Sequence, residues 1–94
     1  MTLNIPVTLD HLERAIKATH VSGGLTQHCL VAQAVKDAGI PFSSVGRQTI
    51  YDQDADSVYG GGHAMGVLTS AFDTRQYDKL RAMLPLTLTL TRVR

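Results

Sequence analysis

Cys29 is the residue whose type and position most directly suggest covalent chemistry. We expect a helix over Thr26–Gly39, which would place the thiol in the first turn, where backbone N–H groups and the helix dipole favour a thiolate. His28, or His63 brought in from a later segment, would complete a Cys–His nucleophile. The thiol also falls on the apolar stripe of the helix, and free cysteine is among the most buried residue types. A buried structural cysteine is therefore the favoured interpretation, and a cysteine hydrolase using Cys29 and His63 is the alternative.

The glycine-rich segment Gly60–Gly66 is the stronger candidate for a binding site. Its glycines allow positive φ angles and let a ligand approach backbone N–H groups closely. A helix that begins directly after them would favour a bound phosphate. The segment matches neither a P-loop nor a dinucleotide-binding fingerprint, and a flexible hairpin connection is the alternative interpretation. The residues expected to bind a ligand are Arg47, Tyr59, Gly60, Gly61, Gly62, His63 and Arg75.

We expect no metal, no cofactor and no nucleic-acid partner. The sequence contains no Cys-x-x-Cys or His-x-x-x-His spacing, which structural zinc sites commonly use. Asp52, Asp54 and Asp56 begin like a calcium loop, but the glycine and glutamate that such a loop needs do not follow. Basic residues are scattered, few aromatic residues accompany them, and the net charge is only +1.

Composition predicts a single globular domain over residues 1–94. The chain has 94 residues, of which 44% are hydrophobic and 18% charged, as in ordinary folded proteins. One cysteine excludes an internal disulfide and suits a reducing cytoplasm. Neither a secretory signal nor an apolar run long enough for a membrane span is expected. So short a domain buries a limited core, so we also expect a homo-oligomer.

Two β-strands are expected to frame the chain. Leu3, Ile5 and Val7 alternate with polar residues or proline, which is the period of a half-buried strand, and Pro6 places it at a sheet edge. The closing segment Leu86–Thr91 alternates leucine with threonine in the same way. We expect these two strands to be neighbours.

The middle of the chain is expected to hold two further strands. Ser43–Tyr51 has the alternation and β-branched content of one continuous strand. Ser57–Tyr59 would return as a short hairpin strand after an acidic turn.

Helices are expected before and after these middle strands in the sequence. One would begin at Thr8 or Asp10, with Asp10 and Glu13 at capping-box spacing, and end near His20. A later helix is expected within Val67–Met83, and its limits are ambiguous: it begins at Asp73 with a Phe72–Tyr77 staple, or it begins at Ala64 or Val67 and ends near Lys79. Together these elements predict an α+β fold, in which two or three helices pack on one face of a small antiparallel sheet of three to five strands.

Three features together resemble a group of small, mostly uncharacterised bacteriophage proteins. Thr8–Leu12 opens a helix, and Cys29–Val35 resembles a Cys-Pro-aliphatic-Ala-x-Ala-aliphatic helix, with Leu30 in place of the proline. Tyr77-Asp78 stands before the final alternating strand, as an aromatic-Asp pair does in that group. The resemblance implies a phage accessory protein that acts in the bacterial cytoplasm.

The favoured functional hypothesis is a non-enzymatic binding module. With the resemblance, this would be a phage counter-defence protein that sequesters a nucleotide-derived signal. The alternatives are the cysteine hydrolase described above and a protein–protein inhibitor that presents a sheet edge or a helix face to a host enzyme.

Overall fold

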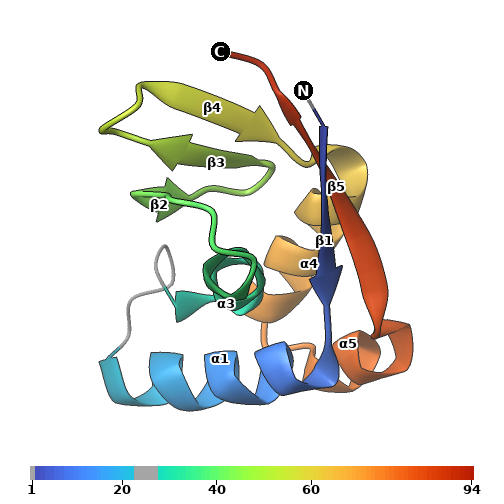
Figure 1. Ribbon diagram of the computed structural model, residues 1–94. Helices are drawn as coiled ribbons and strands as arrows, with labels where there is room; N and C mark the ends of the chain where they lie inside the picture. Colours follow the sequence, from blue (N-terminus) through green and yellow to red (C-terminus); the bar gives the residue numbers. More distant parts are fainter. Residues whose placement is uncertain (1, 23–27) are drawn as a thin grey trace.

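A five-stranded antiparallel sheet is the central layer of the computed structural model, which describes residues 2–22 and 28–94 (Figure 1). The described residues also form four helices, so the expected α+β class is confirmed. The strands are β1 (Thr2–Val7), β2 (Ser44–Val45), β3 (Thr49–Asp52), β4 (Ser57–Gly60) and β5 (Leu86–Arg92). The helices are α1 (Leu9–Ser22), α3 (Leu30–Asp37), α4 (Gly62–Asp73) and α5 (Tyr77–Met83).

The first and last strands lie side by side, as the sequence predicts. The strand order is β1-β5-β4-β3-β2, and β1 is an edge strand that accommodates Pro6. In the β1–β5 register Ile5 is opposite Leu88, and both side chains are buried. Thr87 and Thr89 point to the opposite, exposed face. The leucine–threonine alternation therefore separates a core face from an outer face.

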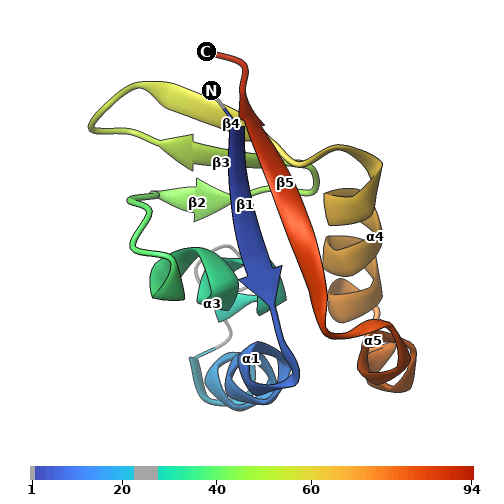
Figure 2. The same ribbon diagram turned by 45° about the vertical axis from the view of Figure 1, so that its right-hand side comes forward.

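The helices gather on the core face of the sheet. Helix α3 packs against β1 and β2, and α4 packs against β5. Helices α1 and α5 lie beside them at one end of the sheet, as both views show (Figure 2). The outer face around Asn4, Thr87 and Thr89 is exposed.

The expected single strand over Ser43–Tyr51 is wrong, because this segment is a hairpin. Strands β2 and β3 are joined by a tight loop in which the Gly46 N–H donates to the Thr49 carbonyl at 2.8 Å. Val45 and Ile50 pair directly and both are buried. An odd separation of five positions cannot put two residues on one face of a continuous strand. The chain must therefore turn between them, which places Arg47 and Gln48 at the tip of the loop.

Helix α1 is capped by Thr8 and not by the Asp10–Glu13 capping box. The His11 N–H donates to the Thr8 Oγ1 atom at 3.3 Å, and the Thr8 N–H donates to the His11 Nδ1 atom at 3.0 Å. This reciprocal pair is a capping box with histidine in the place of the usual glutamate. The helix consequently begins directly after β1.

The central helix is shorter than expected at its beginning. Helix α3 begins at Leu30, and Cys29 precedes it in an extended conformation with φ of −66° and ψ of 175°. The expected cap Thr26 lies outside the described residues. The stop at Gly39 is as expected: this residue has φ of 74° and donates to the Lys36 carbonyl at 3.0 Å.

The last helical region is two helices, so each of its expected limits is partly right. Helix α4 ends in a Schellman motif, in which the Arg75 N–H donates to Phe72 and the Gln76 N–H donates to Ala71. Arg75 takes the left-handed position with φ of 59°. The expected contact of Phe72 and Tyr77 is present, with ring centroids 5.7 Å apart. Because Arg75 occupies a position that usually holds glycine, the sequence carries no clear signal for this break.

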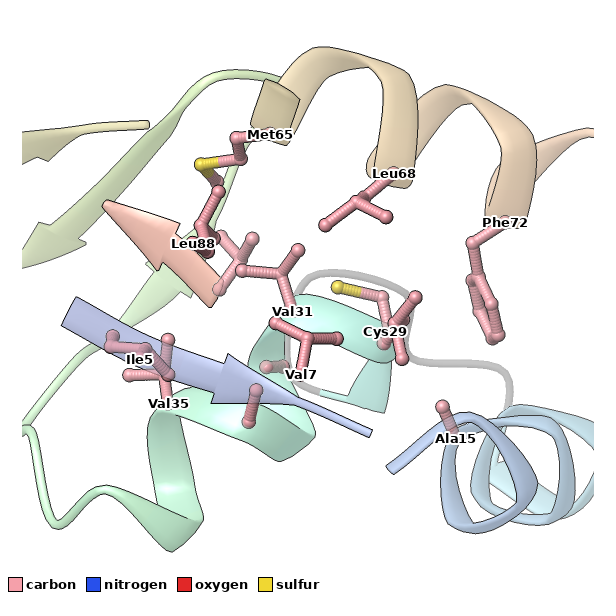
Figure 3. Close-up of a cluster of buried hydrophobic side chains, with 14 of the residues drawn as sticks. Ile5, Val7, Ala15, Cys29, Val31, Val35, Met65, Leu68, Phe72 and Leu88 are labelled. Atoms are coloured by element: carbon pink, nitrogen blue, oxygen red, sulfur yellow. The ribbon is translucent and has the colours of Figure 1, made fainter. Parts of the chain in front are cut away.

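The buried side chains form one core cluster between the sheet and the helices. Figure 3 shows its centre, where side chains from β1, α3 and α4 meet. The members labelled there are Ile5, Val7, Ala15, Cys29, Val31, Val35, Met65, Leu68, Phe72 and Leu88. Cys29 is therefore part of the packed interior.

Candidate functional site

The Cys29 thiol does not have the environment of a nucleophile. Only 4% of the residue is exposed, and it lies among apolar side chains that include Leu68 and Phe72 (Figure 3). Burial raises the pKa of the thiol, and this outweighs the lowering by the neighbouring backbone amides of α3. A raised pKa keeps the group protonated and inert near neutral pH.

His63 does not accompany Cys29. It is exposed in the first turn of α4, whereas Met65, Leu68 and Phe72 of the same helix point into the core that contains the thiol. The His63 side chain lines a cleft on the surface of the protein. The geometry therefore gives no support to the Cys29–His63 hydrolase.

The cleft beside His63 lies between the β2–β3 loop and helices α4 and α5. We call it the cationic cleft; its volume is about 320 Å³, within the range of small-molecule sites. Its lining residues are Arg47, Gln48, His63, Gly66, Val67, Ser70, Ala71, Gln76 and Lys79. Two of the predicted binding residues, Arg47 and His63, therefore meet in one hollow.

The loop that carries Arg47 and Gln48 is fastened to α4 at both residues. The buried Thr69 hydroxyl donates to the Arg47 carbonyl at 2.7 Å, and the Gly61 N–H donates to the Gln48 carbonyl at 2.8 Å. Gly66 lets the Gln48 side chain lie against α4, since a Cβ built there would be 2.9 Å from the Gln48 Nε2 atom. These anchors hold the backbone of the loop and leave the Arg47 side chain exposed.

The charges of the cationic cleft are not compensated within the described chain. Arg47 and Lys79 make no ion pair with any described residue, and no carboxylate is among the described lining residues. By contrast, Arg14, Arg81 and Arg94 each contact a carboxylate. Two cations, a histidine, a hydroxyl and amide groups form a lining that suits an anion with several acceptor oxygens.

The three predicted glycines have a structural role at the start of α4. Gly62 has φ of 65°, a conformation that other residues rarely adopt. A Cβ on Gly61 would lie 2.5 Å from the Met65 side chain, so this position also has no room for a larger residue. Close packing at Gly61 and the positive φ of Gly62 therefore account for two of the glycines without a ligand.

The same glycines line a second hollow, which opens on the outer face of the sheet. We call it the threonine groove; its volume is about 470 Å³. Its lining residues are Gln48, Thr49, Gly60, Gly61, Gly62, Thr89, Thr91 and Val93. The predicted glycine site is thus a surface adjacent to the cationic cleft.

The two remaining predicted residues line neither hollow. Tyr59 is partly buried and packs against the core cluster. Arg75 is exposed at the left-handed position after α4. The structure therefore divides the predicted set among two adjacent hollows, the core and the α4–α5 turn.

Sequence reasoning missed Gln48, Ser70, Gln76 and Lys79. The helical spacing of His63, Gly66 and Ser70 could have indicated one polar face of α4. Lys79 could not have been found in this way, because its position depends on the turn at Arg75.

A second polar cluster joins α1 to α3. His11 is 5% exposed, and its Nε2–H donates to the Asp37 Oδ2 atom at 2.8 Å while its Nδ1 accepts from Thr8. Arg14 also donates to Asp37, at 3.1 Å for the Oδ1 atom, and pairs with Asp10 at 2.9 Å. Hydrogen bonds from Arg14 and His11 lower the pKa of Asp37 to about 2. We call these residues the His11 cluster.

The His11 cluster does not present a free catalytic group. Both ring nitrogens of His11 already have partners within the protein, so neither is available to a substrate. A hollow of about 300 Å³ adjoins the cluster, but its lining includes Asp10 and Asp37 and no unpaired cation among the described residues. The arrangement is that of a structural connection between two helices.

Known proteins offer no match to this chain, and its described residues show neither a metal-binding group nor a membrane-spanning helix. The chain matches no protein-family model, no curated protein and no solved structure. Within residues 2–22 and 28–94, histidine, cysteine and acidic side chains form no group that could hold a metal ion. None of the helices in these ranges has the length and apolar character needed to cross a bilayer.

Proposed function

We propose that the chain is a non-enzymatic binding module and that the cationic cleft holds the anionic part of a nucleotide-type small molecule. The observation that carries the proposal is the uncompensated charge of Arg47 and Lys79 on a cleft without carboxylates. Exposed cations are solvated, so they cost little in the free protein and remain available to a phosphate or a carboxylate.

The anchored loop supports binding of a specific ligand over loose attraction of ions. Thr69 and Gly61 donate to the successive carbonyls of Arg47 and Gln48 and so fix the backbone of the loop, which lowers the conformational entropy that a ligand must remove. Gln48, Ser70 and Gln76 bring neutral donors and acceptors to the same hollow. A charged ligand with a polar body would use both sets of groups.

The resemblance to phage proteins provides the proposed biological setting. A small binding module of this kind would sequester a nucleotide-derived signal in the bacterial cytoplasm and so counter a host defence. The cleft is open on one side, and a homo-oligomer would enclose the ligand more fully. Cys29 has no part in this proposal, because its thiol lies in the core.

Isothermal titration calorimetry with a panel of nucleotides tests the proposal. The panel contains mononucleotides, cyclic dinucleotides, ADP-ribose and the uncharged nucleoside adenosine. We expect saturable binding of at least one phosphate-containing ligand, and we expect Arg47→Ala and Lys79→Ala each to weaken it by roughly tenfold or more, which is the loss expected for a charged hydrogen bond.

Lys17→Ala is the matched control for charge. Lys17 is exposed on α1 and makes no ion pair within the described chain. It should leave the affinity unchanged. Failure of every anion to bind, or an equal loss in all three variants, would overturn the proposal.

A further inference from the structure

The cationic cleft and the threonine groove are adjacent parts of one surface. Gln48 lines both hollows. Gly62 of the groove is followed directly by His63 of the cleft. A ligand longer than one hollow would therefore pass from one to the other across Gln48.

The floor of the threonine groove is a notch in the outer face of the sheet. Gly60 of β4 pairs with Thr49 of β3 on one side and with Thr91 of β5 on the other. Paired residues of antiparallel strands point to the same face, so two threonines flank a position without a side chain. Gly60 is thus a partly exposed position without a side chain between two threonines, and the Val93 side chain lies beside it.

The chemistry of the groove differs from that of the cleft. None of the described residues that line the groove is ionisable. The hydroxyls of Thr49 and Thr91 form no hydrogen bond with another described residue, whereas Thr89 donates to the Asn4 Oδ1 atom at 3.0 Å and keeps its oxygen as an acceptor. Unpaired hydroxyls beside an open backbone suit a flat or ring-shaped group that is neutral and carries both donors and acceptors.

We propose that the two hollows bind one ligand, a nucleoside phosphate whose phosphate lies in the cationic cleft and whose nucleoside lies over Gly60 in the threonine groove. This inference rests on the proposed function, because the cleft must first bind the anion. It adds that the neutral part of the ligand determines specificity. The protein would accordingly bind a nucleotide more tightly than an inorganic anion of equal charge.

Gly60→Val is the variant that tests this inference most directly. Gly60 is in a strand, and a Cβ built on it meets its nearest neighbours at 3.6 Å and 3.9 Å, which are ordinary contacts. The side chain of valine would fill the notch and suits a strand. Thr87→Val is the control, because Thr87 is exposed on the same face of β5 but does not line the groove. Thr91→Val, which removes only a hydroxyl, is a second variant should Gly60→Val fail to fold.

The readout compares a nucleoside diphosphate with pyrophosphate in calorimetry. We expect Gly60→Val to lower the affinity for the nucleoside diphosphate by at least about tenfold, and Thr91→Val to lower it by a few-fold. In both variants the affinity for pyrophosphate should stay within about twofold of that of the unmodified chain. Thr87→Val should change neither. An unchanged affinity for the nucleoside diphosphate in the groove variants, or an equal loss for both ligands, would overturn the inference. If the unmodified chain binds neither ligand, the proposed function fails as well; if it binds both equally and only Arg47→Ala matters, the further inference alone fails.

Discussion

The His11 cluster and the cationic cleft each contain charged residues from distant parts of the chain, but among the described residues these charges are paired in the cluster and unpaired in the cleft. In the cluster, Asp37 accepts hydrogen bonds from His11 and Arg14, and Arg14 also contacts Asp10. In the cleft, Arg47 and Lys79 have no carboxylate partner among the described residues. The cleft is instead held together by neutral hydrogen bonds from Thr69 and Gly61. The comparison suggests that compensated charge stabilises the fold and that uncompensated charge is available to a ligand.

Substitution of His11 should have the largest effect on stability and none on ligand binding. His11→Ala removes the capping-box partner of Thr8 and the partner of Asp37 and leaves a buried cavity. We expect a loss of about 2–3 kcal/mol in the free energy of unfolding, measured by urea denaturation. His11→Gln, which keeps an acceptor for the Thr8 N–H, should lose less. A stable His11→Ala chain with weakened ligand binding would reverse the assignment of the two regions.

Removal of the Thr69 hydroxyl should affect both stability and binding. Thr69→Val keeps the shape of the side chain but leaves the Arg47 carbonyl without its donor. We expect a loss of about 1–2 kcal/mol in urea denaturation and a weaker affinity, since the loop is released. Thr19→Val is the control: its hydroxyl donates to the Ala15 carbonyl within α1 at 2.9 Å and does not contact the cleft, so the loss of stability should be smaller and the affinity unchanged. An unchanged affinity in Thr69→Val would show that the anchor does not prepare the cleft.

Arg75 tests whether an unpaired cation must line the cleft in order to contribute to binding. It makes no ion pair within the described ranges, but it lines neither hollow. Arg75→Gly relieves the left-handed conformation and should raise the free energy of unfolding by up to about 1 kcal/mol, without changing ligand affinity. Thermal denaturation and calorimetry measure the two quantities. A loss of affinity would extend the binding site to the α4–α5 turn.

Acid should lower the free energy of unfolding, because protonation of Asp37 weakens the His11 cluster. The pKa of this carboxyl is about 2 in the folded chain and 3.8 in its ordinary state, so its stabilisation is complete above the ordinary value. It is lost as the pH falls through this interval. Asp37→Asn should therefore be less stable than the unmodified chain at about pH 6, and the difference should shrink steadily as the pH falls toward about 2. Because the side chain is nearly half exposed, we expect a modest effect; parallel pH profiles would contradict it.

Substitution of the cleft cations should have the smallest effect on stability. Arg47→Ala combined with Lys79→Ala removes exposed side chains without partners in the described chain, so the free energy of unfolding should change by less than about 0.5 kcal/mol. Urea denaturation of the double variant beside Lys17→Ala checks this expectation. A large destabilisation would mean that these cations stabilise the fold and are not reserved for a ligand.

Local patterns in the sequence predicted the elements better than their connections. Period-two alternation identified β1 and β5, which were also expected to be adjacent and do pair in the sheet. Gly39 marked the end of α3. The β2–β3 hairpin was missed because alternation looked continuous through its loop. The turn at Arg75 was missed because the left-handed position is occupied by arginine.

The candidate site was only partly accessible from the sequence for a related reason. Arg47 and His63 were expected to act together and do line one cleft. The hydrogen bond between His11 and Asp37 spans 26 positions, and neither its geometry nor the place of Lys79 follows from local periodicity. Such contacts depend on the angles between helices, which are set by tertiary packing.

An NMR titration of the ¹⁵N-labelled chain with a nucleoside diphosphate tests the central contrast most directly. We expect saturable shift changes at Arg47, Gln48, His63 and Lys79, and resonances of His11 and Asp37 that stay in place. The same titration of Arg47→Ala should require a much higher ligand concentration. The absence of saturable shifts, or shifts centred on His11 and Asp37, would contradict the assignment of binding to the uncompensated cations.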